Sequence, residues 1–385
     1  MKKSLLALGV LGAFAGAVHA QSNVTLYGIV DAGLTYVNNE SGSKNIKLGS
    51  GNLQGSRWGL RGTEDIGGGL NAIFVLENGF SLNNGQAGQG GRMFGRQAYV
   101  GLSSATAGTI TIGRQYDSVV DYVGPLASGS QWATFSGAHV LDNDNLNNSF
   151  RINNSVKYTT ANYGGFSASA LYGFSNQANA GGGTGFANNR AWSVGMGYAN
   201  GPLTLGAGYL YLGSPNAVSN SASTGNGTPG IGGGAVSGDF NNVVGNFGVD
   251  KAQIYAAGGS YAFGPAVVGL VYSHSKYDYT QVFGSSTKFD NIEVNGKYML
   301  TPALQLGAAY TYTWSKQGGS GIQRKPKWHQ VALGADYWLS KRSDVYMVGL
   351  WQHNSGDSVL TQLNGQGLSS SVNQIAVTAG IRHKF

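Results

Sequence analysis

Four arginines occupy positions from which a side chain would act through its charge. They lie opposite the apolar positions of segments in which apolar and polar residues alternate, at Arg57, Arg61, Arg96 and Arg151. In a β-strand, alternate side chains point to opposite faces, so the four guanidinium groups would lie on the polar faces of their strands. Gathered around one water-filled space, such groups attract anions and repel cations. The chemistry that they indicate is electrostatic.

Two aspartates could face these arginines from a long segment between two predicted strands, Gln115–Ser149. The segment has neither helical nor strand periodicity, and an irregular loop of more than about 15 residues is uncommon unless it is functional. Apolar side chains such as Tyr122 and Trp132 need a surface to pack against, whereas the aspartates need water or cations. We expect the segment to lie against a wet inner wall. Asp117 and Asp121, nearest to the preceding strand, are expected to face the arginines.

No pattern for catalysis, cofactor binding or metal binding accompanies these charged groups. The G-x-G-x-x-G match at Gly225–Gly230 follows no predicted strand and precedes no predicted helix, the context that nucleotide binding requires. Asp142-Asn143-Asp144 lacks the spaced glycine and the terminal glutamate of a calcium loop. The histidines show no zinc-binding spacing, and no G-x-S-x-G occurs. We therefore expect no enzyme, no cofactor and no metal.

The first twenty residues have the pattern of a cleaved secretory signal. Lys2 and Lys3 precede the apolar stretch Ser4–Val18, and small residues around Ala20 form a cleavage site. We expect residues 1–20 to be removed and residues 21–385 to form a single domain.

The composition narrows the class of this exported chain. Only 11% of its residues are charged, against about 25% in typical soluble domains. It has no cysteine, so no disulfide stabilises it. The net charge of +7 falls by two, to +5, when Lys2 and Lys3 are removed. Because no basic cluster is interleaved with aromatic residues, nucleic-acid binding is not expected.

Alternation of apolar and polar residues with period two continues through most of the chain, beginning at Val24–Val37. A transmembrane strand needs about 9–11 residues, more than the five or six that are usual in soluble strands. About sixteen segments predict an all-β protein. The others are Arg57–Asp65, Leu70–Leu82, Arg96–Leu102, Thr109–Arg114, Arg151–Thr159, Phe166–Phe174, Trp192–Tyr198, Leu203–Leu212, Lys251–Phe263, Ala266–Ser275, Asn291–Leu300, Leu304–Trp314, Lys327–Trp338, Asp344–Trp351 and Asn373–Phe385.

The connections between these segments alternate between short and long. Turns such as Gly67–Gly69 and Gly264–Pro265 alternate with long stretches rich in Gly, Ser and Asn, such as Asn38–Gly55 and Gly213–Val249. Short connections on one side and long ones on the other are typical of outer-membrane barrels, and closure removes the sheet edges that lipid does not tolerate. The sequence predicts a transmembrane, antiparallel, up-and-down β-barrel of sixteen strands.

Five runs carry a family resemblance: SNVTLYGIVDAGLTYV (22–37), SRWGLRGTED (56–65), RQAYVGLS (96–103), TITIGRQYD (109–117) and GIRHKF (380–385). With them the chain resembles the general diffusion porins of Gram-negative outer membranes, of the β-proteobacterial type. The resemblance implies a trimeric, sixteen-stranded barrel whose third external loop, here Gln115–Ser149, folds into the lumen. Acidic residues on that loop face basic residues on the wall in this family. The wall residues that match by motif are Arg57, Arg96 and Arg151, with Arg61 one lumen position further along.

We therefore expect a passive, water-filled channel for small hydrophilic solutes and ions in the outer membrane, with a weak anion preference. A channel specific for phosphate, a sugar or a dicarboxylate is the alternative, and an enzyme or adhesin barrel is a third possibility. The expected partners are two further copies in a homotrimer, outer-membrane lipids and lipopolysaccharide. The barrel assembly machinery is expected to recognise the last strand, which ends at Phe385.

Overall fold

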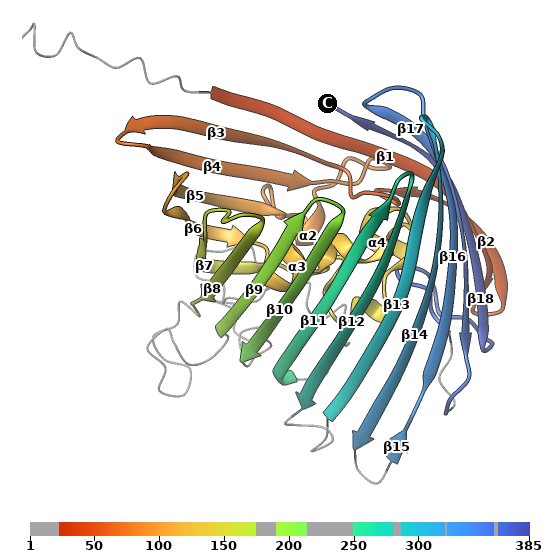
Figure 1. The fold of residues 1–385 in the computed structure, drawn as a ribbon. Helices are drawn as coiled ribbons and strands as arrows, with labels where there is room; N and C mark the ends of the chain where they lie inside the picture. Colours follow the sequence, from red (N-terminus) through yellow and green to blue (C-terminus); the bar gives the residue numbers. More distant parts are fainter. Residues whose placement is uncertain (1–22, 175–189, 214–248, 280–285, 320–321, 358–360) are drawn as a thin grey trace, which may run out of the picture.

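The computed structural model describes residues 23–174, 190–213, 249–279, 286–319, 322–357 and 361–385. The strands within these ranges form a single antiparallel sheet (Figure 1). They are β1 (Asn23–Glu40), β2 (Ser43–Ser50), β3 (Arg57–Gly67), β4 (Leu70–Gly79), β5 (Gln97–Ser104), β6 (Gly108–Gln115), β7 (Ile152–Thr159), β8 (Phe166–Gly173), β9 (Arg190–Asn200), β10 (Leu203–Gly213), β11 (Val249–Phe263), β12 (Ala266–Tyr279), β13 (Ser286–Thr301), β14 (Leu304–Gly319), β15 (Ile322–Arg324), β16 (Lys327–Trp338), β17 (Ser343–Asn354) and β18 (Asn373–Lys384). The helical segments are α2 (Gly88–Gly91), α3 (Ser118–Tyr122), η1 (Gly124–Leu126), α4 (Ser128–Gln131), η2 (Phe135–Gly137) and η3 (Val140–Asp142).

The sheet closes into a barrel where β1 meets β18. These strands pair from Ile29 with Lys384 to Val37 with Ala376. On its other side β1 pairs first with β3 and then with β2, and β14 pairs in the same way with β16 and then β15. Because β2 and β15 lengthen the wall at existing strands, they do not widen the barrel. The sixteen-stranded barrel is confirmed.

One predicted loop is partly strand. The sequence predicts Asn38–Gly55 as a long connection between strands, but β1 runs on to Glu40 and the chain returns as β2 after a two-residue turn. Ile46 and Leu48 alternate with polar residues there and are exposed, and β2 pairs with the second half of β1, from Ala32 to Glu40. The predicted loops Ser175–Asn189 and almost all of Gly213–Val249 lie outside the described residues.

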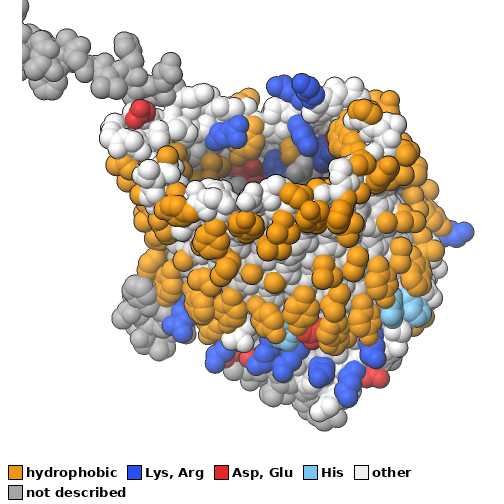
Figure 2. Space-filling view, in the orientation of Figure 1, with side chains coloured by type: hydrophobic (Ala, Val, Ile, Leu, Met, Phe, Trp, Pro, Cys, Tyr) orange, Lys and Arg blue, Asp and Glu red, His pale blue; other side chains and the backbone are white. Residues whose placement is uncertain are grey.

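Side chains are distributed in the opposite way from those of a soluble protein. On β1, Leu26 and Leu34 are exposed on the outer face, whereas Asp31 and Thr35 are buried on the inner face. The outer surface accordingly carries a broad hydrophobic band, and charged groups gather at its rims and in the opening (Figure 2). An apolar exterior of this kind matches a lipid environment. Within the described ranges, no helix has both the length and the apolarity to cross a membrane.

The connection between β6 and β7 folds into the barrel and packs on its inner wall. Its Val119 and Leu126 join a buried cluster with Leu210 of β10 and Ile254 of β11. The third external loop therefore lies in the lumen, as the resemblance implied.

Trp132 of this loop packs its ring against a part of the wall where two glycines, Gly307 and Gly334, have no side chain. A Cβ at Gly307 or Gly334 would come within 2.5 Å or 2.7 Å of its ring, closer than real contacts allow. Glycine at both positions makes room for the tryptophan, which fixes the middle of the loop against β14 and β16.

Candidate pore constriction

The inward loop begins with a short helix that Asp117 caps. Its Oδ1 accepts hydrogen bonds from the backbone N–H groups of Val119 (2.8 Å) and Val120 (3.2 Å), in the first turn of α3. Its Oδ2 accepts a third from Asn145 Nδ2 (2.9 Å). Burial raises the pKa of the Asp117 carboxyl to about 6. The structure thus places Asp117 inside the loop, where it organises the helix, and away from the arginines.

The far part of the loop is anchored by a buried network around His139. The Nδ1 atom of His139 lies 2.5 Å from Oδ2 of Asp144, and its Nε2 atom lies 3.4 Å from Oε2 of Glu293 in β13. Glu293 also accepts hydrogen bonds from the N–H and the hydroxyl of Ser128, both at 2.7 Å. Burial alone would lower the pKa of His139, but Asp144 and Glu293 together raise it well above its usual value. A protonated His139 therefore ties the loop to the wall.

Asp142 holds the return of the loop toward β7. It accepts hydrogen bonds from the N–H of Asn147 (2.9 Å) and from the N–H (3.1 Å) and hydroxyl (2.7 Å) of Ser149. Burial, followed by the charge of Asp144, raises the pKa of Asp142 to about 7. The carboxyl groups of Asp142 and Asp144 thus both serve to fold the loop and to hold it in place.

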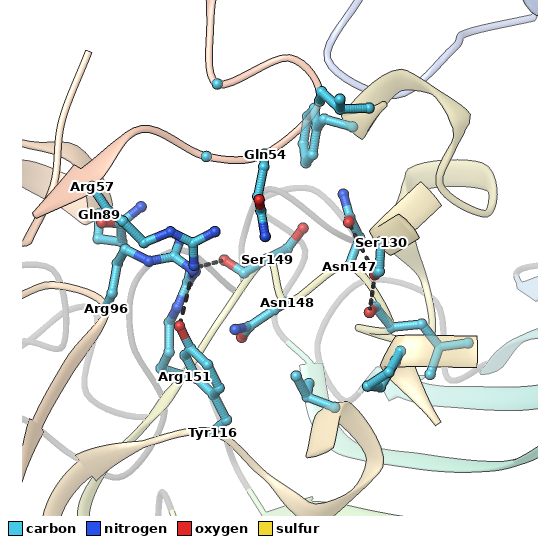
Figure 3. A pocket seen from close by; sticks show the side chains of 18 of the residues that line it. Gln54, Arg57, Gln89, Arg96, Tyr116, Ser130, Asn147, Asn148, Ser149 and Arg151 are labelled. Carbon is cyan, nitrogen blue, oxygen red and sulfur yellow. Dashed lines mark hydrogen bonds between the residues drawn. The ribbon is translucent and has the colours of Figure 1, made fainter. Parts of the chain in front are cut away.

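A cavity of about 790 Å³ lies between the loop and the facing wall (Figure 3). Arg57, at the start of β3, lines it together with Arg96 and Arg151, which precede β5 and β7. The loop contributes Asp121 and uncharged residues such as Asn148. Among the lining residues, three guanidinium groups therefore face one carboxylate. The side chains around the water in the cavity carry a net positive charge.

The arginines are positioned by Glu77, a buried carboxylate of β4. Arg96 Nε lies 2.6 Å from Glu77 Oε1, and Arg57 Nη1 lies 3.9 Å from the same atom. Tyr27 donates to Glu77 through its hydroxyl (3.0 Å), and the hydroxyl of Tyr116 does the same (3.2 Å). Because Glu77 is only 4% exposed, its charge lies behind the arginines and orients them toward the water.

Tyr116 connects these residues to the third arginine. Its hydroxyl accepts a hydrogen bond from Arg96 Nη2 (2.9 Å), and the guanidinium of Arg151 lies 5.7 Å from the centre of its ring. Figure 3 shows Arg57, Arg96, Arg151 and Tyr116 together on one side of the cavity. The first residues after β6 thus help to place the basic wall.

The loop carboxylate at the cavity belongs to Asp121, and it forms an ion pair with Lys157 of β7. Lys157 also donates to the backbone carbonyl of Tyr116 (3.0 Å). The Asp121 side chain remains 29% exposed, so it still contributes to the field in the cavity. The ion pair moderates the only negative charge among the lining residues.

Arg61 lies apart from the three cavity arginines. It is exposed on β3 nearer to the Gly67–Gly69 turn, and its guanidinium lies 5.5 Å from the ring centre of Tyr27. The structure therefore brings together four of the six predicted residues, Arg57, Arg96, Arg151 and Asp121. It adds Glu77 and Lys157 to the group. Alternation places Glu77 on a non-lipid face and Lys157 on the same face as Arg151, and this was the signal available for them.

A closed barrel with an apolar exterior and a charged lumen defines an outer-membrane channel. Within the described ranges, no group of three His, Cys, Asp or Glu side chains could hold a metal ion. The family description "Gram-negative porin" matches residues 7–357, and the chain belongs to that family. It is an outer-membrane porin, a channel for the passive diffusion of small hydrophilic solutes. The proteins of its family are channels.

Individual relatives agree with this assignment. An outer membrane porin protein of Bordetella pertussis is 33% identical over 426 residues, and outer membrane porin protein 32 of Delftia acidovorans is 32% identical over 403 residues. Each alignment covers 100% of both chains. Among solved structures, the anion-selective porin from Comamonas acidovorans matches with a TM-score of 0.73 at 28% identity, covering 95% of this chain and 100% of that one.

Proposed function

We propose that this porin prefers anions and that Arg57, Arg96, Arg151 and Asp121 form its constriction. The observation that carries the proposal is the excess of three guanidinium groups over one carboxylate around the cavity. Opposed rings of charge set the selectivity of pores. The name of the anion-selective relative from Comamonas acidovorans supports the same direction. Arg61 adds a positive charge to the approach, and Asp117 folds the loop.

The proposal includes a homotrimer built through the outer face of β18 and β1–β6. The large exposed side chains within these strands are aliphatic, as at Leu34, Val100 and Ile112, and an exposed aromatic residue, Phe385, directly follows β18. On the later strands, exposed aromatic residues begin with Tyr158 of β7. Aromatic residues are typical of a barrel face that meets the lipid interface. Two strands of this face, β5 and β6, have 8 residues each, whereas β11–β14 have 14 to 16. An aliphatic face that is low at β5 and β6 suits contact with a second copy.

Three further parts of the proposal concern processing and partners. Residues 1–20 are a signal that is removed, which leaves residues 21–385 as the single barrel domain. The barrel assembly machinery engages the last strand, whose Phe385 exchanges two backbone hydrogen bonds with Gly28 (3.0 and 3.1 Å). Lipopolysaccharide contacts Lys and Arg side chains at the rim of the barrel (Figure 2). Amino-terminal sequencing of the protein from outer membranes tests the first of these directly.

Planar-bilayer recording tests the channel proposal. In a KCl gradient the reversal potential should give an anion-to-cation permeability ratio above one, and conductance should rise linearly with salt. A ratio below one would overturn the anion preference. Block that saturates with one added phosphate, sugar or dicarboxylate would favour the substrate-specific alternative. Gel filtration with light scattering of the detergent-solubilised protein should give three copies per particle, and a monomer would overturn the trimer.

A further inference from the structure

The first external loop also borders the cavity. Between β2 and β3 the chain turns inward, and Ser50, Gly51, Leu53, Gln54 and Gly55 line the same space as the arginines. Figure 3 shows Gln54 reaching into the cavity between Arg57 on one side and Asn147 on the other. The constriction is therefore enclosed by this loop, by Gln89 and Gly90 of the connection between β4 and β5, and by the constriction loop, as well as by the wall.

A buried carboxylate of β1 holds this inward segment. Asp31 is 0% exposed, and its Oδ2 accepts hydrogen bonds from the backbone N–H groups of Leu53 (2.9 Å) and Gln54 (2.6 Å). Its Oδ1 accepts from the hydroxyl of Tyr346 in β17 (2.6 Å). Its backbone carbonyl accepts from the N–H of Gly51 (2.7 Å). One residue thus fixes both ends of a short turn and connects it to β17, which lies two strands from β1 around the barrel.

The side chain of Gln54 is oriented by a charged group of β18. Arg382 Nη1 donates to Gln54 Oε1 (3.2 Å), and Arg382 is itself held by Asp344 (3.0 Å) and Asp336 (3.4 Å). Because a guanidinium only donates hydrogen bonds, the oxygen of the Gln54 amide must face Arg382. The two N–H bonds of the amide then point away from Arg382.

The inward segment is also joined to the constriction loop. The backbone N–H of Phe135 donates to the carbonyl of Asn52 (2.7 Å). The two loops therefore form one hydrogen-bonded border, and Gln54 keeps a fixed distance from the residues that face it.

We propose that Gln54 is a specificity-determining residue of the pore and that Asp31 is the residue that positions it. The inference deepens the proposed function and rests on it, since it concerns the same cavity. Gln54 offers amide N–H donors to an anion that the arginines attract. It is also an uncharged position in a charged border, so a charge placed there changes the field that a passing ion meets. The Asp31 charge, in contrast, is engaged by backbone N–H groups.

Charge substitutions at Gln54 test the first part. In bilayers with 0.1 M salt, Gln54→Glu should lower the anion-to-cation permeability ratio about fourfold, and Gln54→Lys should raise it by a similar factor, the effect of one charge at the cavity wall. Gln86→Glu is the matched control and should leave the ratio unchanged, because Gln86 is exposed and is not among the residues that line the cavity.

Asp31→Asn tests the positioning role. The amide cannot accept all three hydrogen bonds, so the inward segment should loosen and the open-channel current should become noisier. In this background, Gln54→Lys should shift the ratio by less than half of its effect in the wild type. An undiminished shift would show that Asp31 supports only the fold. Tyr346→Phe keeps the carboxylate and should produce an intermediate loss.

The outcomes separate the inference from the proposed function. If the wild type prefers anions but Gln54→Glu and Gln54→Lys both behave like Gln86→Glu, the inference is overturned and the proposed function stands. If the wild type shows no anion preference but the two Gln54 variants shift the ratio in opposite directions, the proposed function fails and the inference stands.

Discussion

Removing the charge of Arg151 should shift the selectivity of the channel toward cations by an amount that the cavity's size determines. Arg151 lines the cavity, packs over the ring of Tyr116 and donates to the carbonyl of Ser149 (3.5 Å). Arg151→Gln removes one positive charge while keeping a polar side chain of moderate length. The bulk of the wall, formed by Arg57 and Arg96 with Glu77 behind them, is left in place.

The magnitude follows from Coulomb's law. An ion at the centre of a cavity of 790 Å³ lies about 6 Å from a charge on its wall, where a unit charge in water changes the ion's energy by about 0.7 kcal/mol. Salt at 0.1 M, with a Debye length of about 10 Å, reduces this to about 0.4 kcal/mol. Because anions and cations respond with opposite sign, their difference changes by about 0.8–1.4 kcal/mol, or about four- to tenfold in the permeability ratio.

Reversal potentials in a KCl gradient measure this ratio directly. Arg342→Gln is the matched control, since Arg342 is exposed in the turn between β16 and β17 and its replacement should leave the ratio unchanged. The change should also grow as the salt concentration is lowered. If Arg151→Gln and Arg342→Gln give the same ratio as the wild type at low salt, the electrostatic account of the cavity is wrong.

Three further outcomes are expected. Asp121→Asn should raise the anion preference about fourfold or more in the same assay, because Lys157 loses its carboxylate partner; a fall in the ratio would contradict this. His139 holds its proton to higher pH in the folded state than in the unfolded state, so its stabilisation is complete below about pH 6.5 and is lost as the pH rises through the raised pKa. The melting temperature in detergent should therefore fall with rising pH more steeply in the wild type than in His139→Leu, which cannot bind the proton beside Asp144. Equal pH dependence in the two proteins would argue against a protonated His139 that ties the loop to the wall. Asp117→Ala should lower stability by about 1 kcal/mol through loss of the helix cap without changing the permeability ratio, and thermal unfolding with bilayer recording separates the two readouts.

The wall of the constriction was accessible from sequence, whereas most of the loop was not. Alternation placed Arg57, Arg96 and Arg151 on inner faces, because a charged side chain on the lipid face of a barrel strand is destabilising. For a side chain on a loop inside the lumen, no such rule selects one of two directions. An aspartate there can face water, cap a helix or bind backbone N–H groups, and Asp117 proves to be a cap.

The border formed by the first loop shows the same limit over a longer range. Alternation places Asp31 on a non-lipid face of its strand, but its hydroxyl partner is Tyr346, 315 residues away in sequence. No local pattern reports such a pairing. The one local signal for the Asp117 cap, an aspartate directly before Ser118 at the start of a turn, is short and matches many loops.

The seam between β1 and β18 has a kinetic consequence. Thr35 and Thr378 meet across it although 343 residues separate them, so the hydrogen bonds that close the cylinder join parts of the chain made at very different times. Contacts between distant residues form slowly because the loss of loop entropy precedes their gain. Until this seam forms, two strand edges stay open to pairing with other chains. The exported polypeptide must therefore be kept from aggregating until the last strand can meet the first.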